Sequence, residues 1–334
     1  MSGLAPLYSL RRWIGRLFFM LPRSRIFGIL LIGVGVALAA AGLLGPRVIH
    51  LDARVPLDVE ENTMRLHDSE AKSRIVGDPD AGVVVGPMVR QLHTTVQEPV
   101  DEDNATMRVG VSVRREQAPS EAEGLTTAQV WDFGIDRRTG KINTQMRVSD
   151  QIASPPADIS ANCWWLNFPP NPEQTTYQIF DDTLRRCEPA VFRGEEDVAG
   201  RPAYHYYQRI DPTNVAQEYN GPFTITHFSD GREGYLYHSA DRDVWVDQET
   251  GMLLKLSENI DDYYGDAHAN RVEDNFTFHG RMPEQDVSAR AEASAEVAKR
   301  GVVGIIFQVL KFLGAVLILG GLGVTFWPRG KARR

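Results

Sequence analysis

One stretch of the sequence combines residue types and spacing that could do chemistry. Asp261, Asp262, Asp266 and His268 fall within the stretch 261–268. Clustered carboxylates can bind Ca²⁺ through their oxygens, and a pair of them can serve glycoside hydrolysis. Acidic stretches of this kind are more often solvated loops, and we favour that interpretation.

Other catalytic patterns are absent from the sequence. It contains no GxSxG elbow, HExxH pair, Walker loop or dinucleotide-binding glycine pattern, and its eight histidines show no paired spacing. We therefore predict that the protein is not an enzyme and has no catalytic residues, no cofactor and no metal site.

The two cysteines, Cys163 and Cys187, are the remaining reactive side chains. In an oxidising compartment such a pair most simply forms a disulfide, and two buried free thiols are the alternative. The disulfide would close a loop of 24 residues and stabilise the fold by roughly 3 kcal/mol.

The segments that would position these residues have mainly the composition of β-strands. Tyr235–Glu258 has the composition of two strands around the turn Asp247–Gly251, where Gly251 suits a positive φ. A second copy of the turn lies at Asp136–Gly140. Further strand-like runs are Ala81–Arg90, Ala105–Arg115, Thr126–Asp136, Thr175–Phe180, Ala203–Ile210 and Phe223–Phe228. These runs predict an antiparallel sheet domain, with a loop at 155–172 and a helix at 285–300.

The hairpins favour a broad curved sheet that presents an apolar face to a lipid. The candidate lipid-binding residues are Trp131, Tyr235, Tyr237, Trp245 and Leu254. Ordinary sheet core is the alternative interpretation of all five.

Charge is distributed unevenly along the chain. Residues 1–45 and 301–334 each carry five basic residues and no acidic ones, whereas 46–300 holds 26 basic and 44 acidic residues, a net charge of −18. A domain this acidic will not bind nucleic acid through bulk electrostatics.

The basic residues at the two ends of the chain flank two long apolar stretches. Ile26–Leu44 has no charged residue, and Val302–Trp327 is interrupted only by Gln308 and Lys311. Each is long enough to cross a bilayer, and the flanking basic residues place both termini in the cytoplasm. A cleavable signal peptide is the alternative for the first stretch.

The predicted division is a basic cytoplasmic segment 1–25, a transmembrane helix 26–45, a periplasmic β-rich domain 46–300 with a helical stalk at 285–300, a transmembrane helix 301–327 and a basic cytoplasmic tail 328–334. The segment 7–21 is either a helix on the cytoplasmic leaflet or a disordered flank.

Small residues in the first span could mediate helix packing. Gly33, Ala37 and Ala41 recur every four residues, which predicts a face that packs on the second span or on a partner. Lys311 either marks the membrane interface or contacts a lipid headgroup or a membrane partner.

Several motifs together resemble a known family. They are Leu51–Asp58, Tyr177–Asp182, Phe192–Gly200, Ala203–Tyr206 and Val244–Gly251, placed between the two apolar stretches. Their order resembles the actinobacterial "porin PorA family", which includes polar growth factor A of mycolic-acid bacteria. The sequence departs from the family pattern in its two cysteines and in Gln248, where a proline is common.

The resemblance implies an inner-membrane protein of the mycolate envelope. Members are linked to traffic of trehalose monomycolate with an RND-type lipid exporter, and to maturation of lipomannan and lipoarabinomannan. The turn at Trp245–Gly251 also looks like that of periplasmic lipoprotein carriers, a fold-level analogy.

We therefore expect an α+β membrane protein whose periplasmic domain, mainly antiparallel β and like a lipoprotein carrier, lies between two transmembrane helices. Its expected function is to bind or hand over a glycolipid. The alternatives are a scaffold that recruits envelope-synthesis enzymes without binding lipid and, least favoured, a glycan hydrolase using residues 261–268. We expect no pore, because a membrane barrel needs many tilted strands with lipid-facing residues and not two apolar helices around an acidic domain.

Overall fold

The structure is a computed structural model that describes most of the chain. The described residues are 23–45, 54–55, 57, 62–74, 82–150, 155–165, 168–300 and 302–326. The predicted leader within 1–22, most of the motif at 51–58 and the tail at 328–334 lie outside them. The chain divides into a helical unit containing the two apolar helices and a β-rich unit at 52–298.

The β-rich unit is built on one 13-stranded sheet. Its strands are β1 (Thr63–Arg74), β2 (Val83–Val100), β3 (Asn104–Arg115), β4 (Leu125–Asp136), β5 (Gln145–Ser149), β6 (Ala157–Ser160), β7 (Tyr177–Asp181), β8 (Arg186–Val198), β9 (Arg201–Asn214), β10 (Ile225–His227), β11 (Glu233–Asp247), β12 (Leu253–Gly265) and β13 (Arg271–Arg281), with short helices α3 (Glu121–Gly124) and α4 (Val215–Glu218). The order across the sheet is β6-β5-β4-β3-β2-β1-β13-β12-β11-β9-β8-β7, with β10 paired to β11. All named strand pairs are antiparallel, which confirms the predicted sheet type.

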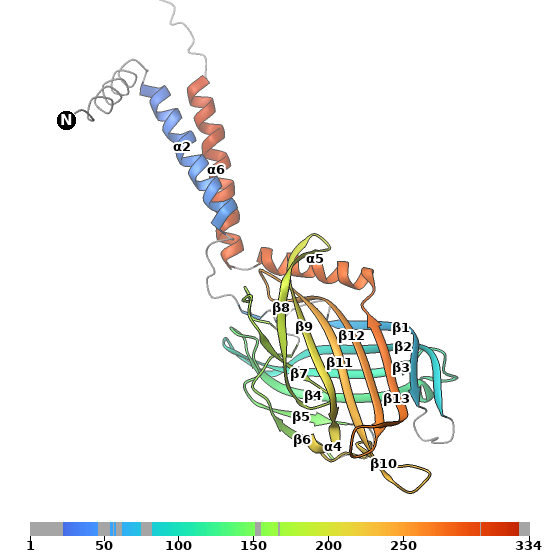
Figure 1. The fold of residues 1–334 in the computed structure, drawn as a ribbon. Coiled ribbons are helices and arrows are strands. Elements are labelled where there is room, and N and C mark those ends of the chain that lie inside the picture. The colour runs from blue at the N-terminus through green and yellow to red at the C-terminus, as the bar shows by residue number, and fades with distance from the viewer. Residues whose placement is uncertain are drawn as a thin grey trace, which may run out of the picture. The chain divides into compact units, whose positions relative to one another are not determined.

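One face of this sheet is enclosed by the sheet itself. In β3 the odd-numbered residues from Ala105 to Val113 are buried, and in β11 the even-numbered residues from Leu236 to Val246 are. Figure 1 shows that β8, β9, β11 and β12, coloured yellow to orange, lie across the blue-to-green strands β1 to β4. Alternate side chains of a strand point to opposite faces, so one set of side chains fills the interior of the curled sheet.

The two predicted turns have the same construction. In each, an aspartate oxygen, from Asp136 or Asp247, accepts the N–H groups of the second and third following residues and the hydroxyl of the third. Gly140 and Gly251 close the turns with φ of +71° each. This confirms the recurring turn, whose positive φ favours glycine.

A two-residue bridge connects β7 to the chain that follows β4. The Ile142 N–H donates to the Cys163 carbonyl at 2.9 Å. On the other side, the Trp164 N–H donates to the Gln178 carbonyl at 2.9 Å, and the Phe180 N–H donates to the Trp164 carbonyl at 2.8 Å. The bridge therefore closes the curled sheet along β7.

A disulfide between Cys163 and Cys187 ties this bridge to β8. The predicted disulfide is therefore present. The segment 155–172 is not the plain loop that we predicted, because it contributes both β6 and the bridge residue Trp164.

Helix α5 (Glu284–Arg300) confirms the helix predicted at 285–300. Its Arg290 side chain donates to the carbonyl of Leu253 at 2.7 Å, and Ser294 shares a 2.8 Å hydrogen bond with Thr250. The helix is thus attached to the hairpin of β11 and β12.

The helical unit is an antiparallel pair of α2 (Arg23–Leu44) and α6 (Val302–Phe326). Contacts recur every seven residues, pairing Gly28 with Gly321, Gly35 with Gly314 and Gly42 with Phe307. A Cβ on Gly35 would lie 2.8 Å from the Gly314 carbonyl oxygen, so the backbones approach closely because side chains are missing there. Both helices are long and apolar enough to cross a membrane.

Candidate functional site

The interior of the curled sheet contains a row of charged residues where apolar core would be expected. The buried members are Arg90, Asp181, Asp182, Gln208, His238, Arg242, Glu258 and Asp262. They come from β2, β7, β9, β11 and β12 and from the residue after β7. Buried charges are costly unless paired, so such a row marks this region as the candidate site.

The first half of the row surrounds His238. Its Nδ1 lies 2.6 Å from Oδ1 of Asp262, and its Nε2 lies 3.4 Å from Oδ2 of Asp181. The same Asp181 oxygen is 2.7 Å from Nη1 of Arg242. The contacts of Asp181 Oδ2 are ion pairs without hydrogen-bond geometry, while its Oδ1 accepts the Leu184 N–H at 2.6 Å.

The second half of the row links Arg242 to Arg90. Arg242 Nε donates to Oε1 of Glu258 at 2.7 Å, and its Nη1 donates to Gln208 at 2.8 Å. Arg90 donates to Oε2 of Glu258 at 3.0 Å and to Asp182 at 2.7 Å. Seven ionisable groups therefore alternate in charge from Asp262 to Asp182 when His238 is protonated.

Pairing controls the protonation of this row. Burial opposes the charged form of His238, but Asp262 and Asp181 outweigh it and raise its pKa to about 10. Burial also opposes ionisation of Asp181, but Arg242 and His238 outweigh it and hold its pKa below the usual range. Burial lowers the pKa of Arg90 less than Asp182 and Glu258 raise it. The raised pKa of His238 favours the imidazolium at neutral pH, while burial, opposed by His238, also raises the pKa of its partner Asp262.

A small cavity adjoins the charged row. Its polar wall is formed by Arg90, Asp182, Arg242 and Glu258. Its apolar wall is formed by Leu92, Trp165, Phe168, Ile179, Phe180, Val244, Leu253 and Leu256. The volume is about 20 Å³, enough for about one water molecule. The cavity therefore combines apolar and charged lining residues around a small volume.

Trp165, the residue after the bridge, supplies part of the aromatic lining. The Trp165 ring lies 5.5 Å from Trp131, 5.6 Å from Phe133 and 5.4 Å from Phe180. Aromatic edge and stacked contacts at these distances add to the burial of the rings. The Cys163–Cys187 disulfide thus holds a segment that forms part of the cavity.

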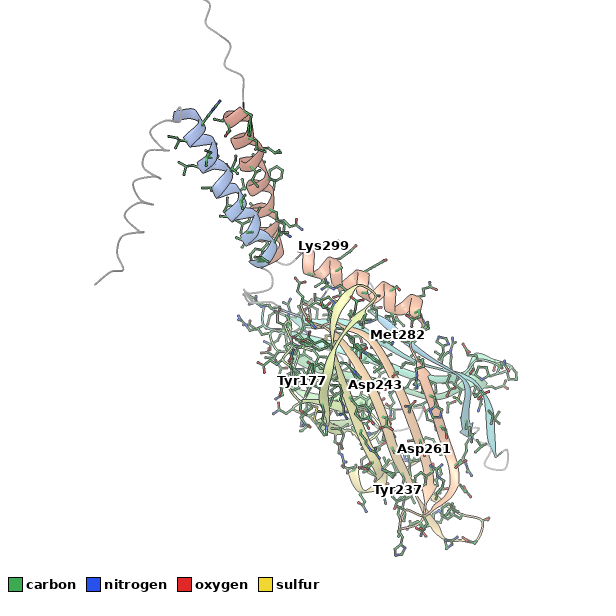
Figure 2. The ribbon with its side chains drawn as sticks, turned by 45° about the horizontal axis from the view of Figure 1, so that its top comes forward. Tyr177, Tyr237, Asp243, Asp261, Met282 and Lys299 are labelled. Carbon is green, nitrogen blue, oxygen red and sulfur yellow. A yellow bond between two sulfur atoms is a disulfide. The ribbon has the colours of Figure 1, made fainter. Side chains whose placement is uncertain are left out.

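The structure does not gather the five predicted lipid-binding residues around one cavity. Trp131, Tyr237, Trp245 and Leu254 are buried, and Trp131 contacts the aromatic residues of the cavity wall. Tyr235, Tyr237 and Trp245 occupy odd-numbered positions of β11, opposite in direction to its buried charged residues (Figure 2 labels Tyr237 and Asp243 along this strand).

These three outward residues have partners on the outer face. Tyr237 stacks on Tyr263 at 5.3 Å, and the Tyr235 hydroxyl donates to Glu233. Trp245 stacks on His205 at 4.7 Å and lies beneath the Lys255 ammonium. Among the five predicted residues, Trp131 contacts Trp165 and Phe180, which line the cavity.

The stretch 261–268 is not the solvated loop that we predicted. Asp261 and Asp262 belong to β12, and only the chain after Gly265 turns. Asp262 contacts the buried His238, whereas Asp261, labelled in Figure 2, pairs with Arg271 on the outer face. Among the described residues, no group of three or more His, Cys, Asp or Glu side chains is arranged to hold a metal ion.

The predicted contact residues of the first apolar helix lie on its free side. Gly33, Ala37 and Ala41 are exposed, and a Cβ on Gly33 would meet no atom within 4 Å. This stripe does not pack on α6. Lys311 lies beside Gly42 in the helix pair, and contact with a further partner stays a prediction for all four residues.

The charged row was missed in the sequence although a signal for it exists. The turn at Asp247–Gly251 pairs β11 with β12, and this register sets Arg242 opposite Glu258 and His238 opposite Asp262. Each pair occupies inward positions that alternate with apolar residues. Opposite charges that face each other across a predicted hairpin, on its apolar side, are the signal that could have identified four of the members.

Comparisons with known proteins agree with this architecture. A family model described as "Porin PorA" matches residues 27–323. The chain is 28% identical over 204 residues to a Porin PorA of Corynebacterium amycolatum, covering 56% of this chain and 50% of that protein. It is 26% identical over 141 residues to a Porin PorA of Corynebacterium resistens, covering 37% and 32%. The matched part thus spans half of the first relative's length and about a third of the second's. Because the family model covers most of its length, the chain belongs to the Porin PorA family.

Proposed function

We propose that the β-rich unit binds an envelope glycolipid, such as trehalose monomycolate, and accepts it from or hands it to a membrane partner without catalysing a reaction. The observation that carries this proposal is the cavity with one aromatic and aliphatic wall and one wall of arginines and carboxylates. A glycolipid has the same division, because its acyl part is apolar and its sugar offers hydrogen-bonding hydroxyls. Ligand pockets generally combine an apolar lining with a few placed polar groups.

The family and the two apolar helices mark the protein as a membrane or cell-envelope protein. We place both helices across the plasma membrane, with residues 46–300 in the periplasm. The support is the charge pattern, since basic residues precede α2 and follow α6 and the segments outside the helices at both ends carry no acid. The disulfide also fits an oxidising periplasm.

The cavity must expand to accept such a ligand. About 20 Å³ holds one water molecule, whereas each methylene of an acyl chain needs comparable space. In this proposal, binding separates the residues that line the cavity.

The partner that we propose is an RND-type lipid exporter or another envelope-synthesis membrane protein. A scaffold that binds such partners without binding lipid is the second candidate. It is favoured by the exposed stripe of Gly33, Ala37 and Ala41, which leaves one side of the helix pair open to close approach by another helix.

The name of the relatives suggests a channel. The interior of the curled sheet can be compared with the interior that a pore requires. A barrel pore needs a polar lumen through the sheet and an apolar outer band. Here the interior is filled by core side chains, and the outer face carries ion pairs such as Arg108–Asp132 and Arg271–Asp261. We therefore favour lipid binding over a pore through this sheet.

The test is native mass spectrometry of the full chain in nanodiscs, purified from a mycolate-producing host, with lipid extraction of the same sample. A stoichiometric glycolipid that is lost on delipidation and regained on adding trehalose monomycolate is the expected result. A bare protein mass with no uptake contradicts lipid binding. Ion conductance of the same sample in a planar bilayer would support a channel.

A matched pair of variants locates the bound lipid. Leu92→Trp should fill the cavity and abolish uptake, because Leu92 lines it and is buried. Leu125→Trp is the control, since Leu125 is an exposed residue of β4. Equal uptake by both variants, at preserved melting temperature, would place the lipid outside the cavity.

The scaffold is tested separately by replacing the exposed stripe. Gly33→Leu with Ala37→Leu should abolish co-purification of membrane partners while leaving lipid uptake unchanged if the stripe is the contact surface. Retention of the partners would show that the helices serve only as anchors.

A further inference from the structure

Arg90 connects parts of the sheet that are not neighbours. It belongs to β2, which is separated from β12 in the strand order by β1 and β13. Its Nη1 nevertheless donates to Glu258 of β12 at 3.0 Å, and its Nη2 donates to Asp182, just after β7, at 2.7 Å. The side chain therefore reaches across the interior, since β7 forms the far end of the strand order.

These three residues also line the cavity. Arg90, Asp182 and Glu258 make up most of its polar lining, which also includes Arg242. Because the cavity has room for about one water, its lining must separate before a larger ligand can enter, for example by movement of β2 away from β12 or from the end of β7. Either movement breaks a hydrogen bond of Arg90.

We infer that Arg90 is a latch that holds the interior closed, and that ligand entry requires its release from Glu258 and Asp182. The inference rests on the proposed function for the kind of ligand that enters. It does not make Arg90 a contact of that ligand.

The surrounding charges allow this release. Glu258 keeps a 2.7 Å hydrogen bond from Arg242 Nε when Arg90 departs, so that carboxylate stays paired. Arg242 also keeps its bond to Gln208 and its ion pair with Asp181. The rest of the row therefore persists on the β11 and β12 side, and only the bonds that span the cavity are lost.

A latch has a distinctive thermodynamic consequence. If ligand binds only to the open form, the apparent dissociation constant equals the intrinsic one divided by the fraction of molecules that are open. Weakening the latch raises that fraction, so it tightens binding even though it destabilises the closed fold. A residue that contacts the ligand, or that only supports the fold, would weaken binding when replaced.

The experiment uses Arg90→Lys in the full chain in nanodiscs. Lysine keeps the positive charge but lacks the planar fork that bonds two carboxylates at once. The probe is a synthetic trehalose monoester with a fluorescent acyl chain, measured by titration. We expect a lower melting temperature and binding about tenfold tighter than in the unmodified chain, from the loss of one charge-assisted hydrogen bond.

Two further variants serve as a second test and as a control. Asp182→Asn removes the negative charge of one partner of Arg90 and leaves its bond to Glu258, so binding should tighten by a smaller factor. Arg108→Lys is the control, because Arg108 pairs with Asp132 on the outer face, and its affinity should equal that of the unmodified chain. Asp182→Asn also carries the test if Arg90→Lys does not fold.

Opening is also measured without lipid. Leu256 is buried in the cavity wall and both native cysteines are in the disulfide, so Leu256→Cys introduces one free thiol. The latch predicts that a soluble maleimide labels this thiol about tenfold faster when Arg90→Lys is added. Faster labelling without any probe binding would retain the latch and overturn the proposed function. Unchanged labelling, or weaker probe binding by folded Arg90→Lys and Asp182→Asn, would overturn the latch.

Discussion

Arg90 and Arg108 lie on adjacent strands and make the same kind of bond in opposite surroundings. Arg108, on β3, donates through Nε and Nη2 to both oxygens of Asp132, at 2.7 and 3.2 Å. Arg90, on β2, donates through two nitrogens to Glu258 and Asp182, at 3.0 and 2.7 Å. The side chain of Arg108 is 51% exposed, whereas that of Arg90 is 5% exposed.

The difference shows that surroundings, more than bond lengths, decide what such a pair does. Water and salt screen the outer pair, and either side chain can leave it at little cost. The inner pair has given up its hydration, so each charge depends on its protein partners. The ion pair of Arg108 on β3 can therefore be lost at little cost, whereas the ion pairs of Arg90 on β2 are needed to stabilise the interior.

The largest expected effect comes from removing the inner arginine. Arg90→Ala should lower the free energy of unfolding by about 3–5 kcal/mol, because the buried Asp182 loses its arginine while Glu258 keeps only Arg242. Urea unfolding of the full chain in detergent, followed by tryptophan fluorescence, measures this change. A loss below about 1 kcal/mol would mean that water already reaches the interior, and the comparison would fail.

The covalent tie at the bridge should have the next largest effect. Replacing both Cys163 and Cys187 by serine should cost about 3 kcal/mol, since the disulfide closes a 24-residue loop. The same urea experiment measures it, with the unmodified chain in reductant as the control. An additive loss on combination with Arg90→Ala would show that the bridge and Arg90 act independently.

A third prediction concerns pH. The pKa of His238 is raised to about 10, so its stabilising contribution is complete below the ordinary pKa of about 6.5 and is lost as the pH rises through about 10. Between pH 8 and 10 the unmodified chain should lose on the order of 2 kcal/mol that His238→Gln does not lose.

The control for this pH dependence is His205→Gln. His205 faces Asp243 and Glu196 on the outer face of the sheet. Parallel pH profiles for the unmodified chain and His238→Gln would contradict the imidazolium in the interior.

The smallest effect is expected at the outer arginine. Arg108→Ala should leave the urea midpoint unchanged at 0.5 M salt, and any shift at low salt should shrink as salt is added, because the pair is exposed. A salt-independent shift as large as that of Arg90→Ala would remove the contrast between the two faces.

Features fixed by nearby residues could be predicted from the sequence. The turns at Asp136–Gly140 and Asp247–Gly251 contain their own hydrogen-bonding aspartate and their own glycine. Helix α5 and the apolar helices follow from composition over a single segment. The cysteine pair was predictable because only two cysteines are present.

Features that depend on distant segments could not be predicted in the same way. Asp181 and Asp182 join the charged row only because β7 curls back to face β2, and no local pattern around them records this. Gly28, Gly35 and Gly42, spaced by seven residues, pack on α6, whereas the predicted stripe that begins at Gly33 and recurs every four residues does not. Both stripes were present in the sequence, and only the partner helix distinguishes them.

The bridge at Trp164 has a consequence for contacts between molecules. A strand at the end of a sheet presents unpaired N–H and C=O groups, which other chains can extend by edge-to-edge association. The Trp164 backbone already bonds to Gln178 and Phe180 along β7. The residue that closes the sheet along β7 therefore also occupies an edge at which copies of this domain could otherwise associate.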